Sequence, residues 1–335
     1  MSKRKITVIR GDGIGPSIVD ATLEILDKVD AGLEYDFVDI GQAALDAGED
    51  LLPQKALDSI EKNAVALKGP VTTPIGKGFS SVNVALRKKF ELFANVRPAL
   101  SFPGTQARYE DIDIITVREN IEGIYSGIGQ TVSEDGERAE LTSVITRTES
   151  KRLVRFAYDM ARRLGRKKVT VVHKANIMKS TSALFLKAAQ DVGDEYPDIE
   201  HNEIIVDACA MRLVMNPDRF DVIVTTNLFG DILSDLCAGL VGGLGMAPGA
   251  NMGENQAMFE AVHGSAPDIA GQNIANPTSV ILAAALMLDH LDQKPQAQAI
   301  RKAIREVIAE GTHTTPDLGG DGTTTGFTKA LIAKL

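Results

Sequence analysis

The sequence predicts an α/β fold with a largely parallel sheet, because short apolar, β-type runs alternate with amphipathic segments of helical period. The first strand is expected at residues 5–10. A helix at 16–29 follows it, and its opening proline suits a first helical turn. A strand at 33–40, a helix at 53–63 and a strand at 64–70 repeat the alternation.

The rest of the chain continues this pattern with one interruption. Further strands are expected at residues 111–119, 168–174, 202–208 and 220–226, and further helices at 148–165, 279–291, 296–311 and 326–335. The segment 124–148 breaks the alternation, since it is rich in Gly, Ser, Thr and short apolar alternations. It predicts a β-hairpin or meander inserted between helical units.

Composition limits the classes of protein to which the chain can belong. The 335 residues carry a formal net charge of −9, and 44% of them are hydrophobic, as in a globular protein of up to two domains. An acidic chain argues against nonspecific binding to nucleic acid or anionic membranes, and no run approaches the roughly 20 apolar residues of a membrane span. Two widely spaced cysteines and an N-terminus that lacks a signal-peptide pattern lead us to expect a cytoplasmic protein.

Three arginines close together in this acidic chain, Arg87, Arg97 and Arg118, indicate a substrate with several carboxylates. A guanidinium group can donate two parallel hydrogen bonds to one carboxylate. Asn83 would share a helical face with Arg87, and Ser81 would cap the start of that helix. Arg97 is expected at a strand end, where α/β proteins build ligand sites. Surface salt bridging is the alternative interpretation of each arginine.

A glycine-rich turn, GDGIGP at residues 11–16, follows the first expected strand. Its glycines do not have the GxGxxG spacing of a dinucleotide fingerprint. We therefore interpret it first as a strand-to-helix turn, with a nucleotide site as the weaker alternative.

Asp231 and Asp235, in the segment NLFGDILSD, are four residues apart and would lie on one face of a helix. Like charges at this spacing repel, and the sequence offers no Lys or Arg between residues 220 and 293 to offset the repulsion. A divalent cation would offset it, and carboxylate oxygens suit Mg²⁺ or Mn²⁺. Two solvated acids near a helix start are the alternative.

Two further segments have a pattern typical of ligand sites. Lys174 ends the expected strand 168–174 and could act as a general base if its pKa were lowered, with a surface lysine as the alternative. The segment 259–277 mixes Gly, Pro, Asn and Ala with His263 and Asp268, which predicts a loop around a flat ligand. The anionic Asp268 would suit a free ribose 2′-hydroxyl and repel a 2′-phosphate.

Several motifs in combination resemble those of the β-decarboxylating dehydrogenases that act on 2R,3S hydroxy acids. The motifs are RENIEGIYSGI, HKANIMK, NLFGDILSD, GGLGMAPGAN and HGSAPDIAGQNIANP, and the resemblance runs from GDGIGP to the C-terminal helices. This family includes isocitrate, homoisocitrate, isopropylmalate and tartrate dehydrogenases. The resemblance implies the α/β fold of the isocitrate/isopropylmalate dehydrogenases rather than a Rossmann fold.

The resemblance also implies two α/β domains and a homodimer as the smallest unit. The large domain would comprise residues 1–98 and 252–335, and the small domain residues 99–251. A β clasp at 123–148 would interlock two subunits. The active site would lie in the cleft between the domains and take residues from both subunits.

Roles of individual residues follow from their places in the matching motifs. The three arginines would clamp the carboxylates of the malate-like part of the substrate. Lys174 of the partner subunit would assist removal of the hydroxyl proton, and Tyr125 would protonate the enol carbon after decarboxylation. Asp231, Asp235 and Asp207 of the partner subunit would hold Mg²⁺ or Mn²⁺.

The resemblance further implies which substrate and cofactor are used. Ser81 and Asn83 match the isocitrate pattern, in which they hydrogen-bond the γ-carboxylate, whereas isopropylmalate enzymes carry an apolar side chain there. Asp268 and Ile269 stand where NADP-linked relatives carry Lys-Tyr, so NAD is the expected cofactor. The other implied contacts are Thr72 and Thr73 near the nicotinamide and His263, Gly264, Ala266 and Asn276 around the adenosine.

The expected reaction is therefore oxidative decarboxylation of isocitrate to 2-oxoglutarate and CO₂ with formation of NADH, a step of the tricarboxylic acid cycle. A homoisocitrate or tartrate dehydrogenase with a similarly polar pocket is the nearest alternative. A non-catalytic regulatory subunit of a heteromeric isocitrate dehydrogenase is an alternative of another class. It is less favoured because all the implied catalytic residues are present.

Overall fold

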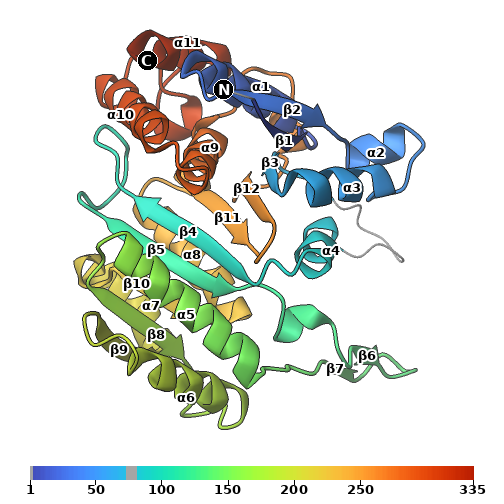
Figure 1. Ribbon diagram of the computed structural model, residues 1–335, viewed down its shortest axis with the longest axis vertical. Coiled ribbons are helices and arrows are strands. Elements are labelled where there is room, and N and C mark those ends of the chain that lie inside the picture. The colour runs from blue at the N-terminus through green and yellow to red at the C-terminus, as the bar shows by residue number, and fades with distance from the viewer. Residues whose placement is uncertain (1–2, 73–80) are drawn as a thin grey trace.

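A computed structural model describes residues 3–72 and 81–335, and most of its strands join one ten-stranded sheet (Figure 1). The strands of this sheet are β1 (Arg4–Ile9), β2 (Leu33–Phe37), β3 (Val65–Lys68), β4 (Ala94–Leu100), β5 (Asp113–Glu119), β8 (Lys168–His173), β9 (Glu200–Ile205), β10 (Val222–Thr225), β11 (Pro248–Met252) and β12 (Ala257–Ala261). Their order is β2-β1-β3-β12-β11-β4-β5-β10-β8-β9.

The predicted parallel sheet is confirmed except at its centre. The β12–β11, β11–β4 and β4–β5 ladders are antiparallel, and the remaining ladders are parallel. Strands β11 and β12 were not predicted from the sequence. The loop expected at 259–277 in fact begins inside β12. Both strands are fully buried apart from Met252, and they lack the polar alternation that identifies a half-exposed strand.

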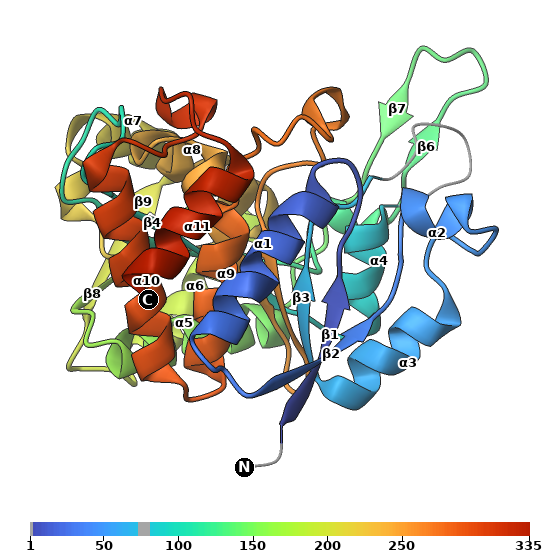
Figure 2. The ribbon, with the colours of Figure 1, turned by 90° about the horizontal axis from the view of Figure 1, so that it is seen from above.

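Helices cover both faces of the sheet. They are α1 (Gly15–Lys28), α2 (Gln42–Asp46), α3 (Gln54–Asn63), α4 (Val82–Lys89), α5 (Arg147–Arg163), α6 (Thr181–Gly193), α7 (Val206–Met215), α8 (Asn227–Leu240), α9 (Thr278–His290), α10 (Lys294–Glu310) and α11 (Thr324–Lys334). Figure 2 shows α1, α9, α10 and α11 on one side of β1 and β3, with α3 and α4 on the other. Further along the sheet, Ile115 and Val117 of β5 pack in one core with α5, whereas Ile114 packs with α7 and α8.

Two predicted positions need correction. The strand expected at 202–208 ends at Ile205. Asp207 lies in the first turn of α7, where an acidic side chain interacts favourably with the helix dipole. Arg97 is not at a strand end but in the middle of β4, where it pairs with Thr116.

The GDGIGP segment is a tight structural turn between β1 and α1. Gly11 has a φ of 74°, and a Cβ there would lie 2.1 Å from the carbonyl oxygen of Pro70. The buried carboxylate of Asp12 accepts hydrogen bonds from the backbone amides of Ala43 (2.9 Å) and Thr72 (2.7 Å). Through these two hydrogen bonds the turn is tied to α2 and to the segment after β3.

The predicted hairpin is confirmed within 124–148, although Ile124–Ser126 form a 3₁₀ turn and α5 already begins at Arg147. Its strands β6 (Thr131–Val132) and β7 (Ala139–Glu140) pair antiparallel and form a separate small sheet. The hairpin projects from the body of the molecule (Figures 1 and 2), and the side chains of residues 127–142 are exposed. Its function as a clasp between subunits stays a prediction.

The predicted domain boundaries fall inside the two central strands β4 and β11, which pair with each other. The division into a large and a small domain stays a prediction. Across residues 3–72 and 81–335, none of the helices has the length and apolar character needed to cross a membrane.

Candidate active site

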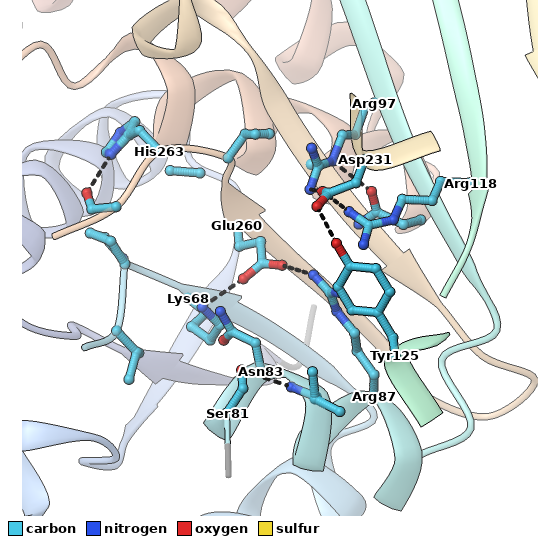
Figure 3. A pocket seen from close by; sticks show the side chains of 18 residues that line it. Lys68, Ser81, Asn83, Arg87, Arg97, Arg118, Tyr125, Asp231, Glu260 and His263 are labelled. Carbon is cyan, nitrogen blue, oxygen red and sulfur yellow. Dashed lines mark hydrogen bonds and ion pairs between the residues drawn. The ribbon is translucent and has the colours of Figure 1, made fainter. Parts of the chain in front are cut away.

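A cavity of about 260 Å³ opens where β4, β5 and β12 approach α4 and α8 (Figure 3). Its polar lining comes from these five elements, from β3 and from the segments that follow β5 and β12, so the fold gathers residues that lie far apart in the sequence. All five residues predicted to bind substrate line it, namely Ser81, Asn83, Arg87, Arg97 and Arg118. The predicted site residues Tyr125, Asp231, His263 and Gly264 line it too.

The start of α4 presents two of these residues. Ser81 is the N-cap of α4, as predicted, and its Oγ accepts a weak hydrogen bond of 3.4 Å from the amide of Val84. Asn83 and Arg87 follow one turn apart on the same helix. The Oδ1 of Asn83 is buried and has no hydrogen-bond partner among the described residues. An unpaired buried polar atom of this kind fits a cavity that binds a polar ligand.

Arg118 is almost completely buried, with 1% of its side chain exposed. Its Nε and Nη2 donate to Asn227 Oδ1 at 3.1 and 2.7 Å, and its Nη1 donates to Asp231. Burial, followed by the nearby charge of Arg97, lowers the pKa of Arg118 to about 10, so it stays charged at neutral pH. Asn227, at the first position of α8, orients this arginine and was not identified from the sequence.

Arg97 links β4 to α8. Its Nε donates to Asn95 Oδ1 at 2.7 Å, and its Nη1 donates to Ser234 Oγ at 2.8 Å and to Asp235 Oδ1 at 3.0 Å. Burial lowers the pKa of Arg97 against the opposing effect of Asp231. The arginine is therefore held by fixed partners on two elements rather than lying free at the surface.

The helix predicted from NLFGDILSD is confirmed, and Asp231 and Asp235 lie one turn apart on α8. No Lys or Arg lies near the two aspartates in the sequence, but Arg118 and Arg97 reach them from β5 and β4 and offset their repulsion. Burial would raise the pKa of Asp231, but Arg118 and the other charges lower it, whereas burial raises the pKa of Asp235. The Tyr125 hydroxyl donates to Asp231 Oδ2 at 2.6 Å (Figure 3).

The metal ligands predicted for α8 have suitable chemistry but are too few within one chain. Carboxylate oxygens are what Mg²⁺ and Mn²⁺ prefer. Among the residues that the structure describes, no group of three or more His, Cys, Asp or Glu could hold a metal ion. Asp231 and Asp235 therefore offer two carboxylates to a divalent metal, and Asp207 of the same chain does not join them.

Lys174 and Asp207, the residues expected to act in the partner's site, lie together and outside the cavity. Lys174 follows β8, and its Nζ donates to Asp207 Oδ1 at 2.6 Å. This hydrogen bond lowers the pKa of the exposed Asp207. Within one chain the structure does not bring either side chain to the arginines.

The predicted cofactor residues lie along one rim of the cavity and beyond it. Burial lowers the pKa of His263, and its Nε2 has no partner among the described residues. Thr72 Oγ1 lies 2.7 Å from Ser265 Oγ, which joins the two predicted cofactor segments. Among the other predicted cofactor residues, Ala266 has a φ of 38°, and Asp268 and Ile269 lie in a 3₁₀ turn. Asn276 donates a hydrogen bond to Asp317. Thr73 lies outside the described residues.

A buried ion pair beneath the cavity was also not identified from the sequence. Lys68 Nζ, at the end of β3, lies 2.6 Å from Glu260 Oε2 on β12. Burial alone would raise the pKa of Glu260, but Lys68 and then Arg87 lower it to about 2. The two residues lie in apolar strands almost two hundred positions apart, so no local pattern identifies them. Figure 3 shows Lys68, Glu260 and Arg87 meeting at one side of the cavity, with Tyr125, Asp231 and Arg118 at the other.

The comparisons with known proteins identify the family. The family model described as isocitrate/isopropylmalate dehydrogenase matches residues 5–331. The chain therefore belongs to this family of dehydrogenases, which confirms the fold expected from the motifs.

Relatives with different substrates are similar to this chain. It is 49% identical to the mitochondrial NAD isocitrate dehydrogenase catalytic subunit 6 of Arabidopsis thaliana, over 99% of this chain and 88% of the relative. It is 46% identical to the 3-isopropylmalate dehydrogenase of Archaeoglobus fulgidus, over 99% of both. A crystal structure of isocitrate dehydrogenase from Methylococcus capsulatus superposes with a TM-score of 0.96 at 52% identity, covering 100% of this chain and 99% of that one. Family membership alone therefore leaves two substrate classes.

Proposed function

We propose that this protein is an NAD-dependent isocitrate dehydrogenase, converting isocitrate and NAD⁺ to 2-oxoglutarate, CO₂ and NADH. The main support for this proposal is the polar N-terminal turn of α4. Ser81 and Asn83 line the cavity beside Arg87, and the unpaired Asn83 Oδ1 would be left buried beside an apolar substituent. A polar site disfavours an apolar group because its own hydrogen-bonding atoms go unpaired.

Several residues of the cavity have a defined task in this proposal. The charged guanidinium groups of Arg87, Arg97 and Arg118 bind and orient substrate carboxylates. The Tyr125 hydroxyl carries a proton that it can deliver to the enol carbon. Burial, followed by the hydrogen bond to Asp231, raises the pKa of Tyr125 and keeps that proton in place. A divalent metal bound at Asp231 and Asp235 would acidify the substrate hydroxyl and stabilise the enolate left when CO₂ departs.

We further propose that the working unit is a homodimer with shared active sites. Large apolar side chains are exposed on α7, α8 and the hairpin, including Met215 (63%), Ile232 (57%) and Val132 (67%). Exposed apolar surface of this extent suits contact with a second copy. Because α7 also carries Asp207, a contact over α7 and α8 would bring it and Lys174 toward the partner's α8.

An isopropylmalate dehydrogenase is the second candidate, since relatives of that name are about as similar as the isocitrate enzymes. The three arginines suit this candidate as well, because its substrate has the same malate-like part. The polar pair Ser81 and Asn83 favours isocitrate over the isopropyl compound.

The test is NADH absorbance with purified protein, Mg²⁺ and a panel of isocitrate, homoisocitrate, tartrate and 3-isopropylmalate, each with NAD and with NADP. We expect the highest kcat/KM with isocitrate and NAD. A higher value for another acid would refute the substrate, and a higher value with NADP would refute the cofactor. No turnover with any pair would identify a non-catalytic subunit instead.

A further inference from the structure

A continuous row of buried amides runs beneath the cavity and joins its two sides. Asn251, on β11, is 1% exposed and lies at the centre of this row. Its Oδ1 accepts hydrogen bonds from Asn95 Nδ2 at 2.8 Å and from Asn120 Nδ2 at 2.9 Å. Its own Nδ2 donates to Glu260 Oε1 at 2.7 Å. Both ends of the Asn251 amide are therefore in use.

The sheet register explains why these side chains meet. Asn251 on β11 lies directly opposite Asn95 on β4, and Asn95 lies directly opposite Arg118 on β5. Directly opposed residues project from the same face of a sheet. The amide row thus runs across the antiparallel centre of the sheet, between the strands that carry the arginines and the strand that carries Glu260.

Each end of the row reaches an arginine of the cavity. On one side, Asn95 Oδ1 accepts from Arg97 Nε at 2.7 Å. On the other, Glu260 Oε1 lies 3.9 Å from Arg87 Nη2, while Glu260 Oε2 pairs with Lys68. Asn251 itself does not line the cavity.

We propose that Asn251 is a positioning residue that fixes Arg97 and Arg87 relative to each other for substrate carboxylates. The proposal rests on the proposed function only in assigning carboxylate binding to these arginines. Because Asn95 donates its Nδ2 to Asn251, its Oδ1 must face Arg97. Without Asn251, the Asn95 amide can rotate and present its NH₂ group to a guanidinium, which has no acceptor.

The same amide orients Glu260 at the other end of the row. Oε1 of Glu260 accepts from Asn251, which leaves Oε2 for Lys68 and sets the plane of the carboxylate. Loss of that donor frees the carboxylate to turn toward Lys68. The distance between the Glu260 carboxylate and the Arg87 guanidinium, and so their attraction, would then change.

The first test is the variant Asn251→Ala, measured with whichever substrate the wild-type protein turns over. We expect its KM for that acid to rise about tenfold or more, the usual effect of losing hydrogen bonds that hold charged groups. Its KM for the nicotinamide cofactor should stay within about twofold, because none of Asn95, Asn251 and Glu260 is among the residues expected to contact the cofactor. A general loss of structure would raise both values together.

The matched control is Asn63→Ala. Asn63 is also a buried amide with several hydrogen bonds, to Thr7, Ser59 and Asp36, but it is the last residue of α3 and does not line the cavity. We expect it to lower the melting temperature with little change in either KM. Equal effects of the two variants on substrate KM would overturn the proposal.

A second variant, Asn251→Asp, separates orientation from packing. Its carboxylate can accept from Asn95 and Asn120, but it can donate to Glu260 only when protonated. The charged groups facing it are Glu260, Lys68 and, through the row, Arg87 and Arg97. We expect kcat/KM for the acid, relative to wild type, to be lowest near pH 8 and to recover as the pH falls toward 6, since two adjacent carboxylates share a proton more readily there.

The outcomes separate this proposal from the proposed function. A wild-type protein that prefers isopropylmalate refutes the isocitrate assignment, yet Asn251→Ala should still raise the KM for isopropylmalate. Unchanged substrate KM in Asn251→Ala, or a pH profile of Asn251→Asp parallel to wild type, refutes the positioning role while leaving the reaction as proposed.

Discussion

Buried charge distinguishes the important side chains of this protein from ordinary surface residues. Taking an ion out of water costs several kcal/mol unless partners replace the water. Arg118 has such partners in Asn227 and Asp231, and Lys68 and Glu260 have each other. These partners replace the lost water, and a substrate carboxylate meets guanidinium groups already fixed in place.

Glu260 gives the first prediction at this scale. Its pKa is lowered to about 2 from an ordinary 4.5, so the folded protein binds its proton less readily than the unfolded chain. The corresponding contribution to stability, about 3 kcal/mol, is complete above pH 4.5 and is lost as the pH falls toward 2. We expect the stability advantage of wild type over Glu260→Gln to shrink between about pH 5 and pH 3.

Urea unfolding of both proteins at fixed protein concentration, from pH 7 to pH 3, measures this difference. Asp20→Asn is the control, because Asp20 forms an exposed pair with Arg10 and should show little change across the same range. A constant difference between wild type and Glu260→Gln would show that the carboxylate titrates in its ordinary range.

Elements bring these residues to one place. The N-terminal turn of α4 presents Ser81 and Asn83, and successive turns of α8 present Asn227, Asp231 and Asp235. Side chains three and four residues apart share a helical face, so each helix delivers a preset group of polar atoms. The central strands β4 and β5 supply Arg97 and Arg118, which contact the carboxylates of α8.

The segment after β12 supports a prediction about cofactor choice. Asp268 and Ile269 lie in a 3₁₀ turn at 267–269, where Asp268 is exposed and Ile269 is half-buried against the core. The double variant Asp268→Lys, Ile269→Tyr should raise the ratio of NADP to NAD kcat/KM about tenfold or more, because it replaces a repelling carboxylate with a phosphate-binding cation.

Steady-state kinetics with both cofactors measure this ratio, and Gln272→Lys is the control. Gln272 donates to the Asp268 carbonyl, so the control adds a similar charge within the same segment. A ratio that shifts equally in both proteins would mean that added charge alone, rather than its position, changes the preference.

At the scale of the whole molecule, the residues expected to act in catalysis lie in two separate places within one chain. Asp231 and Tyr125 are in the cavity, but Lys174 and Asp207 are paired elsewhere. In a two-fold dimer the same surface of each subunit contacts its counterpart, so one contact would complete two sites at once.

Mixing inactive variants tests this arrangement. Lys174→Met and Asp231→Asn should each be nearly inactive, whereas dimers containing one of each would keep one intact site. Random exchange of subunits should then restore about a quarter of wild-type activity. Lys174→Met mixed with Asp207→Asn is the control and should restore none, since both residues would be supplied by the same subunit. Lack of recovery in the first mixture would place each site within one chain.

Local chemistry explains what could be predicted of the fold and the site. The helix carrying Asp231 and Asp235, the cap at Ser81 and the hairpin depend on residues close in sequence, and each was confirmed. The strands β11 and β12 were missed because buried central strands carry no alternation. The place of Asp207 was mistaken because an apolar run continued across the start of α7.

The sequence by itself determined the fold class, the family and the set of polar residues, since periodicity and motifs are written in consecutive positions. Only the tertiary structure decided which charges face each other. Arg97 and Asp235 are 138 positions apart, and Asn95 and Asn251 are 156 apart. Such pairs form because the sheet order brings distant strands and helices together, and their energies depend on burial that no single segment possesses.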